Sequence, residues 1–295
     1  MGNIFSYLFQ KVKIDQSVEL NSGGSPGTEF EEEIPEIDTE CDRMFTKGKP
    51  KRALLVGINY DQDADESNDL RGCENDLLRI SKVLMGKYHF KSEEVYILNS
   101  KTATKENIES SLLNMVVYAQ RNPESELFFH FSGHGTQQTS FLERDGKSEA
   151  LCPLDYGING LISDRWLKKY FVNHLPDSCR LFCLVDCCHS GTSMNLCYNY
   201  NFDKESIECD SDYGRAKAKV IKISGCLDNQ VSYDCYNSSL KIFNGALTDA
   251  FIINSRKEDN VVELVKKIRK HLKQNDFPQI PNLTMSGNLA KMKLY

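Results

Sequence analysis

Two segments of the chain place a histidine or a cysteine directly after an apolar run. Residues 127–135 read Leu-Phe-Phe-His-Phe-Ser-Gly-His-Gly, and residues 181–191 read Leu-Phe-Cys-Leu-Val-Asp-Cys-Cys-His-Ser-Gly. A thiolate is a strong nucleophile, and a neighbouring imidazole generates it by taking the proton of the thiol. His134 and Cys188 each lie among small and polar residues, just beyond an apolar run. The two segments therefore predict a Cys–His dyad, with Cys188 as nucleophile and His134 as base.

Simpler interpretations exist for each residue taken alone. A lone loop histidine usually has no role, and His130 is expected to be buried or structural. Cys183 is expected to point into the core, because neighbouring residues of a strand face opposite sides. The sequence also allows a zinc site, since several metal-binding residues are close together: Cys183, Cys187, Cys188, His189 and Cys197. No second pair follows at zinc-finger spacing, which makes zinc the weaker interpretation.

The elements that must position these residues alternate between strands and helices. Apolar runs predict strands at 52–58, 94–98, 126–131, 180–185, 219–224 and 279–284. Amphipathic spacing predicts helices at 73–85, 104–120, 166–172, 244–253 and 261–273. The alternation predicts an α/β fold with a mostly parallel sheet. In such sheets ligands bind beyond the carboxyl ends of strands, where both chemical segments lie.

Composition and charge favour a globular protein with a separate leader. The 295 residues are 40% hydrophobic and 26% charged, and the net charge is −6. Residues 1–43 contain ten acidic and three basic side chains, so the rest of the chain is close to neutral. We predict a flexible acidic tail or linker at 1–47 and one domain at 48–295. The near-neutral domain gives no indication of nucleic-acid binding.

Cysteine content and hydropathy indicate the compartment. Eleven cysteines, an odd number scattered through apolar runs, favour a reducing environment such as the cytoplasm. No apolar run reaches the length that crosses a bilayer. Gly2 and Ser6 match the N-myristoylation pattern, although so short a pattern also arises by chance. A single acyl chain on Gly2 would give weak, reversible membrane association.

Residues 192–218 interrupt the alternation of elements. They are polar and charged and lack periodicity, which predicts a long exposed loop within the domain. The domain then divides into a large part at about 48–203, a linker at about 204–218 and a small part at about 219–295.

Four segments, in this order, resemble those of type I metacaspases: residues 71–76, 131–135, 186–191 and 223–230. The resemblance covers roughly residues 50–290. It implies a caspase-like three-layer α/β/α sandwich around a mostly parallel six- to eight-stranded sheet. It also implies a cysteine endopeptidase that cleaves after Lys or Arg, made as a zymogen and acting on proteins and peptides. Members of the family are often monomers.

The resemblance assigns roles to individual residues. His134 matches the catalytic histidine and Cys188 the nucleophile, while the backbone N–H groups of Gly135 and Cys188 are expected to form the oxyanion hole. The implied specificity pocket consists of five residues: Asp76, Asp186, Ser132, Cys73 and Asp234. Two close carboxylates are costly to bury unless a cation arrives, which a substrate Lys or Arg supplies. Taken alone, Asp76 could be a helix-start residue and Asp186 an acid in a strand-end loop.

Two departures concern calcium and self-cleavage. Many metacaspases need calcium, which a cluster of acidic residues holds. Here serine occupies positions 148 and 163, where aspartate is usual in the family, and Asn195 lies near a third expected aspartate. Asp164 and Glu149 remain as candidate ligands if calcium binds. Calcium affinity falls as carboxylates are lost, so we expect no cofactor requirement and weak or absent calcium activation.

The predicted loop contains basic residues at which the enzyme could cut itself: Lys204, Arg215, Lys217 and Lys219.

Two alternatives stay open at this point. A non-catalytic caspase-like scaffold or regulatory module would share the fold without turnover. A legumain-type enzyme or transpeptidase would share the fold class but is expected to use a different specificity pocket. The three acidic residues Asp76, Asp186 and Asp234 argue against this alternative.

Overall fold

The computed structural model describes residues 43–61, 69–139, 147–188, 194–209, 214–225, 234–237, 241–255 and 259–295. All of them belong to one compact unit. Gly2 and most of the acidic leader lie outside the described residues. No helix among the described residues is long and apolar enough to cross a membrane.

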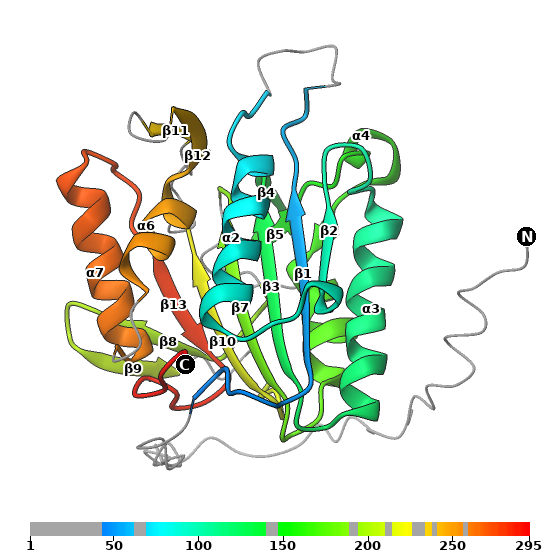
Figure 1. Ribbon diagram of the computed structural model, residues 1–295, viewed down its shortest axis with the longest axis vertical. Helices are drawn as coiled ribbons and strands as arrows, with labels where there is room; N and C mark the ends of the chain where they lie inside the picture. The colour runs from blue at the N-terminus through cyan, green and yellow to red at the C-terminus, as the bar shows by residue number, and fades with distance from the viewer. Residues whose placement is uncertain are drawn as a thin grey trace, which may run out of the picture. The chain divides into compact units, whose positions relative to one another are not determined.

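An eight-stranded sheet forms the centre of the domain (Figure 1). Its strands, in spatial order, are β2 (Val95–Leu98), β1 (Lys51–Gly57), β3 (Glu126–Ser132), β7 (Arg180–Asp186), β10 (Lys219–Ser224), β13 (Asn282–Met285), β8 (Tyr198–Asn201) and β9 (Ser206–Cys209). The first five are parallel, and the last three join by antiparallel pairing. The apolar central strands are buried on both faces, as parallel strands usually are.

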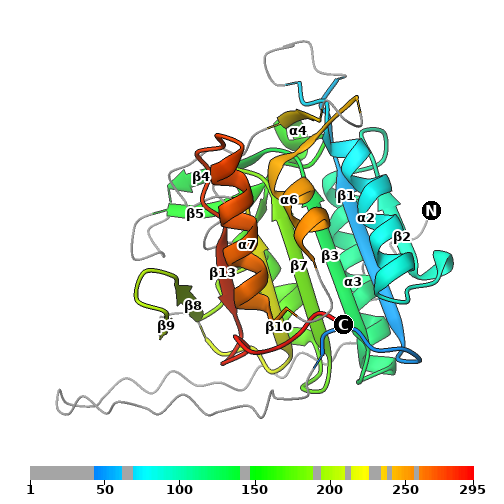
Figure 2. The same cartoon turned by 60° about the vertical axis from the view of Figure 1, so that its left-hand side comes forward.

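Helices cover both faces of this sheet (Figure 2). On one face lie α2 (Cys73–Lys87), α6 (Ala246–Asn254) and α7 (Val261–Gln274), and on the other lies α3 (Lys105–Arg121). The predicted helix start at Thr104 is confirmed, since its hydroxyl accepts a hydrogen bond from the Asn107 N–H at 3.3 Å. Two hydrophobic cores, one on each side of the sheet, hold the three layers together. The expected three-layer α/β/α sandwich is confirmed.

Short elements complete the domain. The helical turns are η2 (Ser92–Glu94), α4 (Tyr156–Asn159), α5 (Asp164–Trp166), the π-helical η3 (Leu167–Phe171) and η4 (Val172–His174). A three-stranded sheet consists of β4 (Gly135–Thr139), β5 (Lys147–Leu151) and β6 (Ile162–Ser163), and a hairpin of β11 (Asp234–Asn237) and β12 (Ile242–Gly245). The sequence did not predict these two small sheets.

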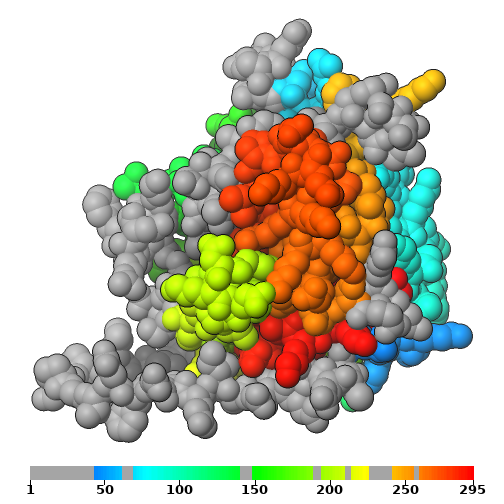
Figure 3. Space-filling model, turned by 90° about the vertical axis from the view of Figure 1, so that its left-hand side faces the viewer, coloured from blue at the N-terminus to red at the C-terminus, as the bar shows by residue number. Residues whose placement is uncertain are grey.

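The expectation that 192–218 forms a loop without regular structure is wrong in part. The strands β8 and β9 form a hairpin that extends the main sheet beyond β13, so β9 occupies part of the predicted linker. Tyr198 and Tyr200 are buried and alternate with exposed or half-buried asparagines. The hairpin lies beside α7 (Figure 3), where Lys266 forms an ion pair with Glu205 at 2.7 Å.

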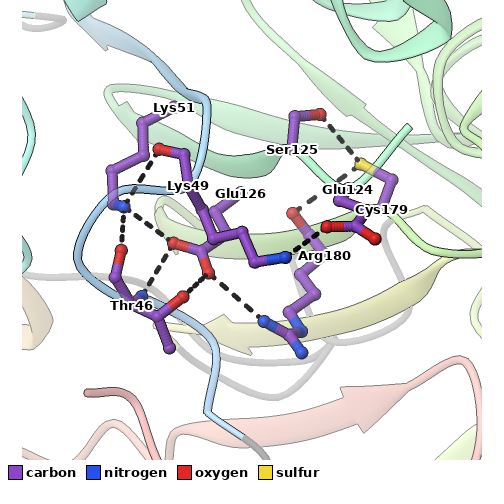
Figure 4. A network of polar contacts seen from close by, with 8 residues as sticks. All are labelled: Thr46, Lys49, Lys51, Glu124, Ser125, Glu126, Cys179 and Arg180. Carbon is purple, nitrogen blue, oxygen red and sulfur yellow. Dashed lines mark hydrogen bonds and ion pairs between the residues drawn. The ribbon is translucent and has the colours of Figure 1, made fainter. Parts of the chain in front are cut away.

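The predicted tail at 1–47 also extends too far. Met44 and Phe45 are buried in the core, and their N–H groups bond to the carbonyls of Lys293 and Leu294 at 2.8 Å. Thr46 joins a polar network at the amino ends of the central strands (Figure 4). There its N–H donates to Glu126, and Lys51 forms a fully buried ion pair with Glu126 at 2.9 Å. This network attaches the start of the domain to the end of the sheet opposite the chemical segments.

Candidate active site

The two chemical segments meet at the carboxyl ends of β3 and β7. These strands are parallel neighbours, and Ser132, the last residue of β3, pairs with Asp186, the last of β7. The Gly133 N–H then donates to the Asp186 carbonyl at 3.3 Å. His134 and Cys188 each lie two residues beyond their strand, so the register brings the two chain segments side by side.

Gly135 contacts the nucleophile segment directly. A Cβ atom on Gly135 would overlap the carbonyl oxygen of Cys188 and lie 2.8 Å from the Cys187 sulfur. Any other residue would therefore push the two segments apart. The backbone of Gly135 is thus close to that of Cys188, as an oxyanion hole built from both would require.

Tyr60 holds the His134 segment in place, and sequence reasoning missed it. Its hydroxyl accepts a hydrogen bond from the backbone N–H of His134 at 3.0 Å and donates one to the Cys152 carbonyl at 2.6 Å. The centres of the Tyr60 and His134 rings lie 4.5 Å apart. The Cys152 N–H returns a bond to the His134 carbonyl at 3.0 Å. Burial raises the pKa of Tyr60 well above its usual value, so the hydroxyl stays protonated. One signal was available in the sequence, because Tyr60 follows the end of a third parallel strand, β1.

Asp76 and Asp186 form a buried pair of carboxylates beside these segments. Asp76 lies on α2 and is fully buried, and Asp186 is 4% exposed. The Ser132 hydroxyl donates to Asp76 at 2.8 Å, so the structure places these two residues in direct contact. Burial raises the pKa of Asp76 well above its usual value, and the charge of Asp186 raises it further. The pair therefore favours a bound proton or an incoming cation.

The junction of β12 and α6 covers the acid pair. The Gly245 N–H donates to Asp76 at 3.0 Å, and both the N–H and the hydroxyl of Thr248 donate to Asp186, at 2.8 and 2.9 Å. A Cβ atom on Gly245 would overlap the Asp186 carboxylate. Asp186 thus caps the amino end of α6, a structural role beyond the strand-end loop that the sequence allowed. Neither Gly245 nor Thr248 carried a signal in the sequence.

The remaining predicted pocket residues lie around this pair. Cys73 is buried one helical turn before Asp76 on α2. Asp234 is the register partner of Gly245 in the β11–β12 hairpin, which brings its backbone next to the pair. The side chain of Asp234 is outside the described part of the structure.

The other cysteines and His130 have structural positions. Cys183 is fully buried in the core, as expected, and burial raises its pKa. Burial, followed by the nearby Cys188, raises the pKa of Cys152 to about 12. His130 is fully buried with Nδ1 3.0 Å from the Leu184 carbonyl, and burial lowers its pKa to about 4. Its predicted structural placement is confirmed.

The two residues left for a calcium site, Asp164 and Glu149, are both buried and lie beside each other. Asp164 accepts hydrogen bonds from the Ser148 hydroxyl at 2.7 Å and the N–H groups of Glu149 and Arg165 at 3.2 and 2.5 Å, so the protein occupies its oxygens. Burial raises the pKa of Asp164, an effect that the fully buried Lys222 ammonium opposes. Calcium needs six to eight oxygen ligands. No group of three or more His, Cys, Asp or Glu among the described residues could hold a metal.

The four candidate self-cleavage residues differ in accessibility. Lys204 lies in the turn of the β8–β9 hairpin and pairs with Glu208 at 2.9 Å. Arg215 and Lys217 are exposed in the segment before β10. Lys219 is the first residue of β10, and its N–H bonds to the Cys179 carbonyl at 3.0 Å. Lys204, Arg215 and Lys217 are therefore all exposed and Lys219 is half-buried, but Lys204 is held in the hairpin by its ion pair, whereas Arg215 and Lys217 lie outside the strands.

Comparison with known proteins gives the family. The family model described as "Metacaspase, peptidase C14 domain" matches residues 51–197. Metacaspase-1B of Aspergillus oryzae is 31% identical over 300 residues, which cover 83% of this chain and 70% of that protein. Metacaspase-1 of Plasmodium falciparum is 33% identical over 78% of this chain, and Metacaspase-2 of Arabidopsis thaliana 34% over 68%. The chain spans only 39% and 51% of the length of these last two relatives.

A solved structure supports the fold. Protein GSU0716 from Geobacter sulfurreducens superposes with a TM-score of 0.57 at 22% identity, covering 83% of this chain and 97% of that one. The family model and the relatives cover both strand ends that carry His134 and Cys188. The chain therefore belongs to the metacaspase family.

Proposed function

We propose that the protein is a cysteine endopeptidase that cleaves peptide bonds after Lys or Arg. Cys188, deprotonated by His134, attacks the carbonyl carbon and forms a tetrahedral intermediate, whose oxyanion is stabilised by the N–H groups of Gly135 and Cys188. The C–N bond then breaks, and the leaving amine takes the proton from His134. Water, activated by His134, hydrolyses the thioester and restores the thiol. The contact between the Gly135 and Cys188 backbones supports this arrangement.

The buried acid pair is the observation that carries the substrate preference. Asp76 and Asp186 are both covered from solvent, and the charge of Asp186 adds to burial in raising the pKa of Asp76. A substrate guanidinium or ammonium would relieve the repulsion between them. Gly245 and Thr248, which now bond to the pair, would have to move or share these carboxylates with the substrate.

A fluorogenic peptide assay tests the proposal. Peptides that differ only in having Arg, Lys, citrulline or Asp at the cleaved position are compared. We expect turnover of the Arg and Lys peptides alone, because citrulline has the shape of Arg without its charge. Cys188→Ala should abolish turnover, whereas Cys209→Ala, at an exposed thiol on β9, should not. Equal cleavage of the Arg and citrulline peptides would contradict the charge argument, and no turnover at all would favour the non-catalytic scaffold.

The same peptide assay tests whether calcium is required. We propose that calcium is not required, on the basis of the hydrogen-bonded Asp164 and its neighbour Lys222. A large rise in rate on replacing chelator with millimolar calcium would contradict this.

We also propose self-cleavage at Arg215 or Lys217. Wild-type protein should then give two fragments on a denaturing gel, and Cys188→Ala a single band.

A further inference from the structure

A second pocket lies between α3 and the edge of the main sheet, at the amino-terminal half of β1. Its volume is about 290 Å³. The side chains that give it its character are Arg52, Tyr96, Ser111, Asn114, Tyr118 and Arg121. The acid pair and the dyad lie at the opposite, carboxyl ends of the strands, so the pocket is a separate site.

The secondary structure explains why these residues converge. Along β1, Arg52 and Leu54 point to the same face as α3, because side chains alternate along a strand. Leu54 pairs with Tyr96 of β2, which puts Tyr96 on that face too. The helix contributes positions that share one stripe at three- and four-residue spacing: 111, 114, 118 and 121.

The pocket is positively charged. Arg52 and Arg121 both line it, and none of the described residues that line it is acidic. Within the described part of the chain, neither guanidinium forms an ion pair with a protein carboxylate. The nearby Glu94 carboxylate accepts the Lys91 N–H at 2.7 Å and caps the turn η2.

Arg52 is held in position by its neighbours. Its guanidinium carbon lies 4.9 Å from the Tyr96 ring centre and 4.3 Å from that of Tyr118, so two aromatic rings fix its orientation. Its Nε is buried and has no hydrogen-bond acceptor among the described residues. A buried donor without a partner is destabilising, and a carboxylate can satisfy an arginine through two parallel bonds.

The neighbouring strand offers a backbone surface. β2 is an edge strand that pairs only with β1 among the described strands. Tyr96 and Ile97 on it are 49% and 43% exposed, so both side chains are accessible to a peptide at this edge. An exposed strand edge can pair with an extended peptide, whose alternate side chains then face one side of the sheet.

We propose that β2 and this pocket together bind an extended acidic peptide segment of a partner protein. The peptide backbone pairs with the free edge of β2, and a Glu or Asp side chain on the α3 face places its carboxylate on Arg52, with Arg121 adding positive charge. Ile97, which points to the opposite face, contacts the apolar residues between the acids, whereas Tyr96 lies on the same face as the acidic side chains. This inference does not depend on the proposed peptidase activity.

Fluorescence anisotropy with the full chain tests the proposal. The probe is fluorescein-labelled Val-Glu-Val-Glu-Val-amide, which contains no Lys or Arg, and the matched peptide has Gln in place of Glu. The Glu peptide should bind about tenfold or more tightly than the Gln peptide, since each charge-assisted bond adds affinity. N-methylation of alternate residues on the edge that faces β2 should weaken binding by removing backbone donors.

Protein variants separate the pocket from general charge attraction. Arg52→Gln should reduce affinity about tenfold or more, and Arg52→Lys should weaken it too, because lysine keeps the charge but loses the two-pronged geometry. Thermal unfolding confirms that each variant is folded. Lys82→Gln, at an exposed base on α2 across the sheet, should leave affinity unchanged. Equal affinity for the Glu and Gln peptides, or full affinity of folded Arg52→Gln, would overturn the proposal. Displacement of the peptide by an equal concentration of inorganic phosphate would instead indicate a site for small oxyanions.

Discussion

Replacing Asp76 with Asn separates the charge of this buried side chain from its hydrogen bonds. An Asn oxygen can still accept the Ser132 hydroxyl and the Gly245 N–H, which bond to Asp76 at 2.8 and 3.0 Å. Asn cannot provide negative charge for a substrate cation. The variant therefore tests whether the acid pair is a binding site or only a structural support.

The expected effect on stability depends on pH. Burial and the charge of Asp186 raise the pKa of Asp76 in the folded state, whereas in the unfolded chain the value is about 3.9. Above about pH 4 the folded state therefore binds this proton more tightly, and wild type loses stability as pH rises towards the folded-state pKa. Each unit of difference between the folded-state and unfolded-state pKa values changes the free energy of unfolding by about 1.4 kcal/mol. The difference in unfolding free energy between Asp76→Asn and wild type should therefore favour the variant more at pH 8 than at pH 4. Thermal unfolding of both proteins at both pH values measures this difference.

The expected effect on activity has the opposite sign. Two opposite charges 4 Å apart attract by about 4 kcal/mol at the effective dielectric constant of 20 that suits buried sites. Because Asp186 remains, we expect kcat/KM for an Arg peptide to fall by about 10²-fold to 10³-fold. Selectivity for Arg over citrulline should fall with it. A variant that keeps this selectivity, or that is less stable than wild type at pH 8, would refute the reasoning.

Three further predictions concern residues around the site and at the far end of the sheet. Tyr60→Phe removes the bonds to His134 and Cys152, so it should lower the unfolding free energy by about 2 kcal/mol in urea titrations and reduce kcat. Gly135→Ala forces a Cβ atom against the Cys188 carbonyl, and kcat should fall by about 10²-fold in a protein with native circular dichroism. Lys51→Met removes the fully buried ion-pair partner of Glu126, which keeps Arg180 at 3.2 Å, and should cost about 1.5–3 kcal/mol in urea unfolding. KM for the Arg peptide should not change in Lys51→Met, because the network lies at the opposite end of the strands; a higher KM would contradict that separation.

The main sheet and its helices were predictable because their signals are local. Continuous apolar runs mark β1, β3, β7 and β10, and amphipathic spacing marks α2, α3 and α7. The strand ends that carry His134 and Cys188 followed from the same pattern. The register that makes Ser132 and Asp186 partners then places both segments together.

The β8–β9 hairpin was missed for a physical reason. Its strands are four residues long, and Asn199, Asn201 and nearby charges conceal the alternation of Tyr198 and Tyr200. These tyrosines are buried only because β13 supplies an edge for the hairpin to join. Tertiary contacts thus decided a structure that local propensity disfavoured.

The hydrogen-bond partners of the residues that support the site could not be predicted from the sequence. Tyr60, Gly245 and Thr248 act through distant partners: Tyr60 bonds to a residue 74 positions away, and Gly245 to one 169 positions away. Nothing near them in the sequence indicates those partners. Only the folded arrangement of β1, α2 and α6 reveals them.

The hydrogen bonds that Gly245 and Thr248 make to Asp76 and Asp186 have a consequence for a cut chain. Both carboxylates precede the predicted cleavage segment, and both donors follow it. In addition, β10 is bonded along its length to β7. Hydrolysis near Arg215 would therefore break covalent continuity without separating the fragments, and they should comigrate as one particle until a denaturant dissolves the sheet.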